Sequence, residues 1–211
     1  MNIIYIHGLG SDANSTKGLQ LEAYCKSYYP SINVIRPDLN NSPNMVFDYL
    51  TDLVTTGQKD AQTVLMGSSL GGYFSTLVSH ETNCPALLLN PSTKPHISLQ
   101  RFCENFDVNS QKNRAETIIH TTDGGWQISL ADLDWFNAHQ LTTINHLQKI
   151  TAIIKKADEL LDAKIATNFY QDHGAKVILQ EGGNHQFTDF ESQLPLVITE
   201  IQELIAKNEK N

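Results

Sequence analysis

A serine, an aspartate and a histidine occur along the chain in an order that could support nucleophilic catalysis. Ser69 is the central residue of a Gly-Ser-Ser-Leu-Gly sequence at positions 67–71, which directly follows the apolar run of residues 64–66. Where such a run is a strand and a helix begins just after it, the sharp turn between them projects the serine hydroxyl into solvent. The pattern alone is a weak signal, because turns rich in glycine and serine join many strands and helices.

The other two residue types would activate that serine. A serine hydroxyl is a weak nucleophile at neutral pH and needs a neighbouring base, for which His185 is the candidate. Asp158 is the candidate carboxylate that holds the imidazole in one tautomer and stabilises its charged form. Asp162 is the alternative acid, but we expect it inside a helix, whereas Asp158 closely follows its strand. The order serine, aspartate, histidine is that of α/β-hydrolases.

Two backbone amides are candidate donors to the oxyanion of a tetrahedral intermediate. The amide of Leu70 directly follows the candidate nucleophile, and the amide of Leu9 lies in a turn after the first apolar run. His7 stands in the same turn and could itself react. We interpret His7 instead as a residue that orients the oxyanion loop.

Short apolar runs alternate with helical patterns over most of the chain, which predicts a parallel sheet with helices on both faces. The carboxyl ends of such strands lie at one edge of the sheet, where functional groups gather. We therefore predict one α/β domain over residues 1–211, an α/β-hydrolase fold with about six mostly parallel strands. The expected strands are residues 2–6, 32–35, 63–66, 86–89, 150–154 and 176–179, and the expected helices include 17–28, 70–80, 160–173 and 190–206.

Residues 92–148 break this alternation, and we predict a loop-rich, lid-like insertion after the fourth strand. A short helix at 98–106 and a short strand at 126–128 are expected within it. The insertion would cover the carboxyl edge of the sheet and form a substrate pocket. Aromatic residues there could equally hold the insertion on the core. The candidates for substrate binding are Phe102, Trp126 and Trp135, with Phe106 and Phe136 as further aromatic residues of this segment.

The composition limits the expected partners and compartment. The formal net charge is -8 and the Lys and Arg residues form no dense cluster, so we expect no nucleic acid partner. Three cysteines without paired spacing indicate reduced thiols. No apolar stretch has the length of a signal peptide or membrane span, so we expect a cytoplasmic protein. No histidines pair at metal-ligand spacing, and we expect neither a metal nor a cofactor.

A rival pattern overlaps the first turn. The Gly-Leu-Gly-Ser-Asp-Ala sequence at positions 8–13 fits G-x-G-x-x-G/A, and Asp38 follows the second apolar run like a ribose-binding acid. This pattern alone would predict a dinucleotide site. We give it little weight, because the helix is expected to start after Ser15, too late for Ala13 to pack inside it. A dinucleotide site also leaves the serine, aspartate and histidine unexplained.

Longer sequences around these positions carry a family resemblance. They are His-Gly-Leu-Gly-Ser at 7–11, Gly-Ser-Ser-Leu-Gly-Gly-Tyr at 67–73, Asn-Pro at 90–91, Ala-Asp-Glu-Leu-Leu-Asp at 157–162 and Glu-Gly-Gly-Asn-His-Gln-Phe at 181–187. In this order the chain resembles the YqiA/YcfP family of small bacterial α/β-hydrolases, least so over residues 105–147. Family members often have glycine where this chain has Ala157. The resemblance implies an esterase-like activity on acyl esters or thioesters, with Ser69, Asp158 and His185 as the triad.

The sequence thus predicts a serine hydrolase that cleaves small carboxylic esters or acyl thioesters through an acyl-enzyme on Ser69. Two alternatives use the same residues. The first is a hydrolase-like protein that only binds a ligand or partner, and the second is an acyltransferase that passes the acyl group to an alcohol or amine.

Overall fold

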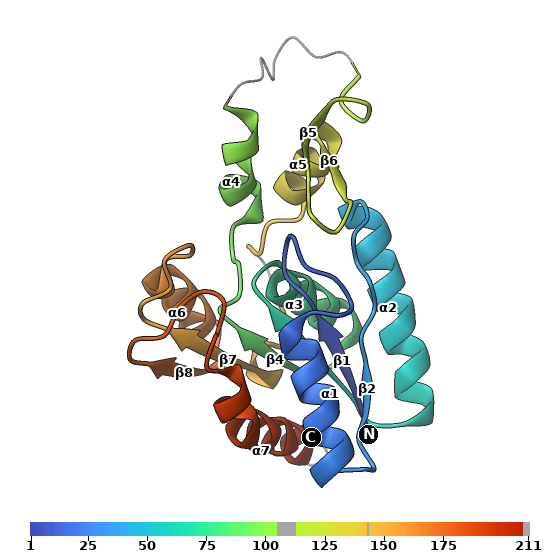
Figure 1. The fold of residues 1–211 in the computed structure, drawn as a ribbon, viewed down its shortest axis with the longest axis vertical. Coiled ribbons are helices and arrows are strands. Elements are labelled where there is room, and N and C mark those ends of the chain that lie inside the picture. The colour runs from blue at the N-terminus through green and yellow to red at the C-terminus, as the bar shows by residue number, and fades with distance from the viewer. Residues whose placement is uncertain (105–112, 143, 209–211) are drawn as a thin grey trace.

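The computed structural model describes residues 1–104, 113–142 and 144–208 (Figure 1). Its centre is a parallel sheet with the strand order β2-β1-β3-β4-β7-β8, which confirms the α/β prediction. The order reverses between β1 and β3, so the carboxyl ends of these two strands flank the crevice where open α/β sheets bind ligands. The strands are β1 (Asn2–Ile6), β2 (Asn33–Ile35), β3 (Thr63–Ser68), β4 (Ala86–Leu89), β7 (Ile150–Lys155) and β8 (Lys176–Gln180).

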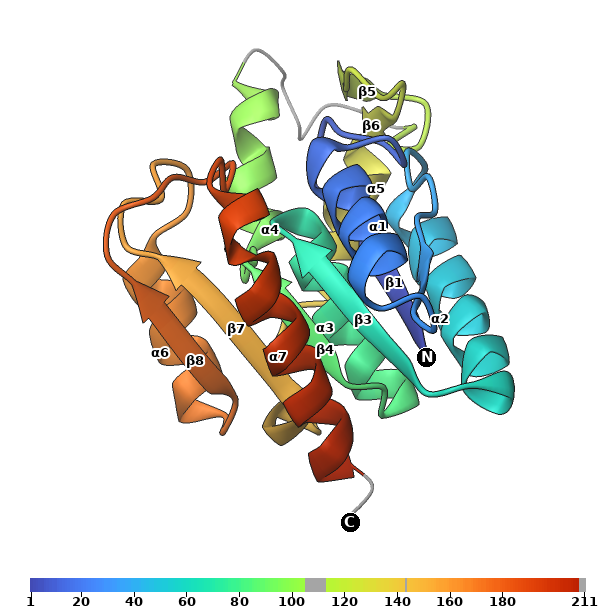
Figure 2. The same ribbon diagram turned by 60° about the horizontal axis from the view of Figure 1, so that its bottom comes forward.

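Helices cover both faces of this sheet (Figure 2). On one face lie α1 (Thr16–Tyr28) and α7 (Phe190–Asn208), and on the other lie α2 (Pro43–Asp60), α3 (Leu70–Thr82) and α6 (Ala163–Asp172). Side chains alternate between the faces along each strand. In β1, Ile3 belongs to the core under α7 and Ile4 to the core under α3. Strands buried on both faces read as continuous apolar runs, which is why they were predictable.

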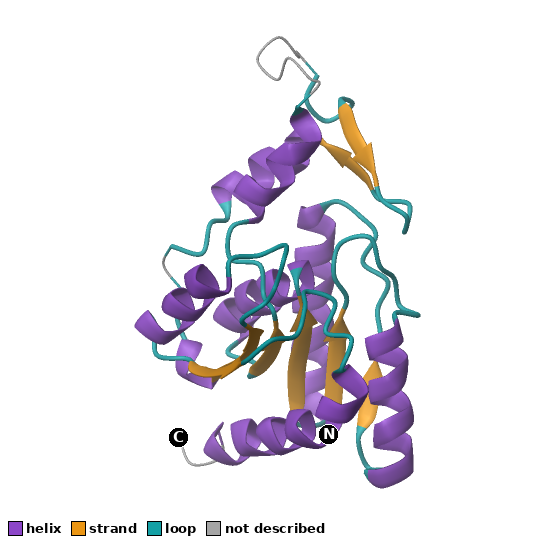
Figure 3. Cartoon of the chain, turned by 60° about the vertical axis from the view of Figure 1, so that its left-hand side comes forward, coloured by secondary structure: helices purple, strands orange, loops and turns teal. Residues whose placement is uncertain are grey.

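The segment between β4 and β7 was predicted to be rich in loops, and it contains more helices and strands than expected. Its elements are α4 (Pro95–Ser98), the 3-10 helix η1 (Leu99–Cys103), β5 (Ile118–Thr121), β6 (Gln127–Ser129), α5 (Leu130–Ala138) and the 3-10 helix η2 (Leu147–Lys149). β5 and β6 form an antiparallel hairpin apart from the main sheet (Figure 3). β6 matches the expected strand at 126–128, whereas β5 was not expected. Figure 1 shows α4, α5 and the β5–β6 hairpin beyond the carboxyl ends of the main strands.

One expected helix start is wrong. The α6 helix begins at Ala163, and Asp162 is its N-cap, with a side chain that accepts hydrogen bonds from the amides of Lys164 and Ile165. Aspartate competes for backbone donors in this way, which favours it just before a helix over inside one.

No helix in the described part of the chain combines the length and the apolar character that a bilayer crossing needs.

Candidate active site

The turn between β3 and α3 holds Ser69 in an unusual backbone conformation where backbone segments approach closely. Ser69 has φ 55° and ψ -118°, outside the regions that L-residues usually occupy. A Cβ at Gly71 would lie 2.1 Å from the carbonyl oxygen of Ile6, and one at Gly67 would lie 2.3 Å from the carbonyl oxygen of Gly71. The two glycines therefore let β3 and α3 cross closely at the end of β1, with Ser69 at the crossing.

His185 bridges Ser69 and Asp158. Its Nε2 lies 2.9 Å from Ser69 Oγ, and its Nδ1 lies 2.8 Å from Asp158 Oδ2. Since an ionised carboxylate only accepts, Nδ1 carries the proton and donates to Asp158, which leaves Nε2 free to accept from the serine hydroxyl. The structure thus brings together the three residues from three separate turns at the carboxyl edge of the sheet.

The Asp158 carboxylate is almost fully enclosed, with 2% of its side chain exposed. Its Oδ1 accepts hydrogen bonds from the amides of Leu160 and Leu161, at 2.9 and 2.8 Å. Burial raises the pKa of this carboxyl, but the hydrogen bonds from His185, Leu161 and Leu160 outweigh burial and lower the pKa below its ordinary value. Asp158 is therefore ionised at neutral pH. The alternative acid, Asp162, is occupied in capping α6.

The backbone of the first turn approaches Ser69 closely. A Cβ at Gly8 would lie 3.2 Å from Ser69 Cβ and 3.8 Å from Ser69 Oγ. Leu9 follows Gly8, and Leu70 begins α3 directly after Ser69. Among the described residues, neither the Leu9 nor the Leu70 amide donates to a protein acceptor. The two candidate oxyanion donors thus belong to the residues that directly follow Gly8 and Ser69, and both amides are uncommitted.

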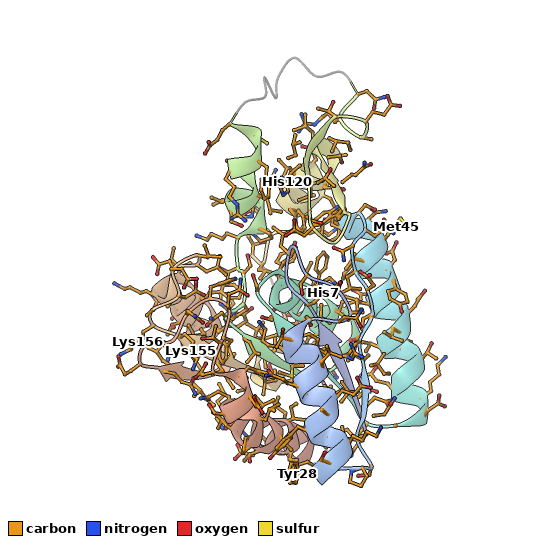
Figure 4. All side chains as sticks on the ribbon, in the orientation of Figure 1. His7, Tyr28, Met45, His120, Lys155 and Lys156 are labelled. Atoms are coloured by element: carbon orange, nitrogen blue, oxygen red, sulfur yellow. The ribbon has the colours of Figure 1, made fainter. Side chains whose placement is uncertain are left out.

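His7 lies between the end of β1 and the inserted segment, as Figure 4 shows. Its Nε2 accepts from the amide of Leu39 at 3.0 Å, so its Nδ1 carries the proton and donates to the carbonyl oxygen of Gly8, also at 3.0 Å. Both ring nitrogens are used in fixing the loop that carries Leu9. This arrangement agrees with the interpretation of His7 as a residue that orients the oxyanion loop.

Two residues that the sequence did not single out for a role hold the His185 loop. The Asn90 side chain is buried, donates to the carbonyl oxygens of Asn184 and His185 at 3.0 and 3.3 Å, and accepts from the amide of Lys155 at 2.8 Å. Glu159 accepts from the amide of His185 at 2.9 Å. Asn90 could have been noticed because it ends a buried strand, where a polar residue needs partners.

A cavity of about 430 Å³ opens on Ser69 and His185. It lies between the start of α1, the α4–η1 segment and the loops that follow β1, β7 and β8. Most of its lining side chains are hydroxyl-bearing or aliphatic. Its lining includes Leu9, Ser11, Ser15, Thr16, Lys17, Gln20, Ser92, Ser98, Leu99, Arg101, Leu160, Leu161, Gln186 and Thr188.

The aromatic residues expected to bind substrate do not line this cavity. Phe102 is stacked on His120 with ring centroids 4.0 Å apart, and Trp126 donates from Nε1 to the buried carboxylate of Asp132. Trp135 packs against Phe74 of α3, as does Phe136. These side chains hold the inserted segment together and onto the core, which was the other role considered for them. Phe106 lies outside the described residues.

The geometry of the first turn does not favour the dinucleotide pattern. The α1 helix begins at Thr16, so Ala13 lies outside it, and a Cβ at Gly10 would meet nothing within 4 Å. The carboxylate of Asp38 accepts from the backbone and side-chain amides of Asn40. In the dinucleotide fold, small residues of this pattern let the helix pack closely on the strand. Neither Gly10 nor Ala13 supplies such packing here.

Comparison with solved structures shows the same fold in esterases. The chain is similar to Est1E from Butyrivibrio proteoclasticus, with 16% identity, a TM-score of 0.74 and coverage of 97% of this chain and 88% of that one. It is also similar to alpha/beta hydrolase domain-containing protein 10 from mouse, with 20% identity, a TM-score of 0.63 and coverage of 98% and 90%. A carboxylesterase from Nitrososphaera gargenis matches with 11% identity, a TM-score of 0.62 and coverage of 98% and 91%.

Comparison with protein-family models assigns the sequence to a family. The model of the family described as "Uncharacterised protein family (UPF0227)" matches residues 2–201, nearly the whole chain. The chain therefore belongs to this family, which is the YqiA/YcfP family that its sequence resembles.

Proposed function

We propose that the protein is a serine hydrolase that cleaves carboxylic esters or acyl thioesters through an acyl-enzyme on Ser69. The observation that carries this proposal is the continuous hydrogen-bond chain from Ser69 through His185 to Asp158, at the mouth of a cavity. Nucleophilic catalysis requires a nucleophile, a base and an acid that orients the base, each within hydrogen-bond distance of the next, and these three residues meet that requirement.

In the acylation step, Ser69 Oγ attacks the carbonyl carbon of the ester while His185 Nε2 accepts the hydroxyl proton. The carbonyl oxygen becomes an oxyanion and accepts hydrogen bonds from the Leu9 and Leu70 amides. The imidazolium is stabilised by Asp158, which stays ionised. His185 then donates the proton to the departing alcohol or thiol, and Ser69 is left as an ester of the acyl group.

Deacylation repeats these roles with water. His185 Nε2 takes a proton from a water molecule as its oxygen attacks the acyl carbon, and the same amides receive the oxyanion. Collapse of the second intermediate returns the proton to Ser69 Oγ and releases the acid.

The fold comparisons support this reaction class by analogy alone. The Nitrososphaera gargenis protein is a carboxylesterase by its description, and Est1E has also been solved with ferulic acid bound. One fold can carry unrelated functions, and it is the residues of the site that support hydrolysis.

The test is hydrolysis of 4-nitrophenyl and thio esters by the protein and by Ser69→Ala. We expect Ser69→Ala to lower kcat/KM by at least about 10⁴-fold without loss of folding, because attack by the hydroxyl is removed. Ser68→Ala, a change at the neighbouring buried serine, is the matched control and should keep turnover within about tenfold. Retained turnover in Ser69→Ala would contradict the proposal.

A fluorophosphonate probe separates the remaining possibilities. Labelling of Ser69 that is lost in His185→Ala supports an activated nucleophile, whereas absence of labelling and turnover indicates a binding protein. An acyltransferase would form more transfer product than acid when an alcohol or amine acceptor is added to the ester assay.

A further inference from the structure

The cavity beside Ser69 has a charge opposite to that of the whole chain. The sequence has 15 Lys and Arg against 23 Asp and Glu. Among the described residues that line the cavity, Lys17 and Arg101 are charged and none is aspartate or glutamate. Clefts lined by one sign of charge raise the local concentration of the opposite sign. The lining therefore favours a substrate with a negative charge.

Lys17 brings a cation next to the reaction centre. It lies in the first turn of α1, and its Nζ donates to the carbonyl oxygen of Gln186 at 2.8 Å, one residue beyond His185. Burial lowers the pKa of this ammonium, and no carboxylate of the described residues forms an ion pair with it. The cost of partly burying the charged Lys17 ammonium is thus not compensated by a carboxylate among the described residues.

Arg101 brings a second cation from the inserted segment. It belongs to η1, and its guanidinium carbon lies 4.9 Å from the centre of the Phe102 ring. Two other arginines pair with carboxylates, Arg36 with Glu22 and Arg114 with Asp134. Arg101 has no such partner within the part of the chain that the structure describes. Its planar group, supported on an aromatic face, suits a carboxylate or phosphate.

We propose that the substrate is an ester or thioester that carries an anionic group, a carboxylate, phosphate or sulfonate, bound by Lys17 and Arg101. This inference rests on the proposed function and specifies its substrate class. Lys17 is anchored beside His185, which would hand its proton to the departing group, so the alcohol or thiol part is the expected carrier of the charge. The hydroxyl groups of Ser11, Ser15 and Ser98 supply further donors in the cavity.

The first experiment compares charged and neutral esters of the same shape. One pair is mono-4-nitrophenyl adipate and its terminal amide, with the charge on the acyl part. The other is the butyrate esters of 4-hydroxybenzenesulfonate and 4-hydroxybenzenesulfonamide, with the charge on the leaving part. We expect kcat/KM to favour the anion by about tenfold or more in at least one pair, and the preference to shrink with added salt.

Variants connect this preference to the two residues. Lys17→Met and Arg101→Met should each reduce the anion-to-neutral ratio of kcat/KM by several-fold, and the double variant should bring this ratio near one. Lys26→Met, the same substitution at the exposed last turn of α1, is the matched control and should leave the ratio unchanged. A ratio near one for the unmodified protein in both pairs would overturn the inference. So would a ratio that the double variant leaves intact.

Binding to Ser69→Ala keeps this inference separate from the proposed function. Isothermal titration with monoethyl adipate and with the butyrate ester of 4-hydroxybenzenesulfonate, each beside its neutral amide, measures the charge preference without turnover. If no ester is hydrolysed but the anion of either pair binds at least about tenfold more tightly than its amide and the double variant loses this, only the hydrolase proposal fails. If esters are hydrolysed but anion and amide bind equally in both pairs, only the anionic-substrate inference fails.

Discussion

At the scale of single residues, Asp158 and Asp162 are alike in type and four positions apart, but their surroundings divide their roles. Asp158 Oδ2 faces the His185 ring at 2.8 Å, while the Asp162 carboxylate lies at the amino end of α6 and accepts from two amides there. A side-chain oxygen at a helix N-cap stabilises a protein by about 1 kcal/mol. The first residue is therefore expected to control activity and the second to control stability.

Substitution of Asp158 should affect activity, whereas substitution of Asp162 should affect stability. Asp158→Asn should lower kcat by up to about 10⁴-fold, because an amide does not hold His185 in the required tautomer or stabilise its charged form. Asp162→Ala should keep kcat within about threefold and lower the free energy of unfolding by about 1 kcal/mol. Ester hydrolysis and urea unfolding measure the two effects. A fall of only a few-fold in Asp158→Asn would exclude the assigned role.

The residues that hold His185 show why a hydrogen-bonded triad needs support outside itself. Asn90 satisfies two carbonyl oxygens of the His185 loop and one amide of β7, from a backbone with φ 41°. Such a conformation costs asparagine less than most residues. The ring position of His185 thus depends on a strand end far away in sequence.

At the scale of elements, the site depends on how closely α3 crosses the end of β1. Gly71→Ala should lower the free energy of unfolding by more than about 2 kcal/mol, because the new Cβ would overlap the backbone of Ile6. It should also reduce turnover, since the end of β1, which leads into the candidate oxyanion loop, must shift. Urea denaturation with a parallel ester assay measures both effects.

Gly57 of α2 is a suitable comparison for that substitution. A Cβ there would lie 3.2 Å from the Thr63 hydroxyl, a contact that a small shift of this side chain relieves and that involves no backbone atom. Gly57→Ala should change the free energy of unfolding by less than about 1 kcal/mol and leave turnover unchanged. Equal effects of the two substitutions would show that the crossing at Gly71 is not tight.

The elements also show what could be predicted from the sequence. The inner strands β1, β3, β4 and β7 were predictable because each is an apolar run that is largely buried, whereas the edge strands β2 and β8 are only partly buried. Ser69 was predictable because it directly follows β3, and Asp158 and His185 because they follow β7 and β8 within a few residues. Lys17 and Arg101 carry no periodic signal, and only the folded chain brings α1 and η1 to one cavity. The aromatic residues of the insertion were candidates for substrate binding and equally for packing, and the sequence could not separate the two roles because large rings supply buried area in either case.

At the scale of the whole molecule, the cysteines report on folding. Cys25 and Cys84 are buried, and burial raises their pKa values to about 11 and about 12, whereas Cys103 is only partly buried. Thiolates are the reactive form, so iodoacetamide should label Cys103 alone in the native protein and all three cysteines in urea. Mass spectrometry of the labelled peptides measures this. Native labelling of Cys84 at the rate of Cys103 would contradict the described packing of β3 and β4.

The connection between β4 and β7 is longer than the geometry of the sheet requires. The two strands are parallel neighbours with Ala86 opposite Ile150. The chain must therefore leave the sheet at the carboxyl end of β4 and return to the amino end of β7. Such a crossover needs about a dozen residues, usually a helix, and α5 packs on α3 in that position. The η1 helix and the β5–β6 hairpin exceed this minimum. A change in the length of η1 or of the β5–β6 hairpin would therefore alter the cavity lining at Arg101 without altering the path of any strand of the main sheet.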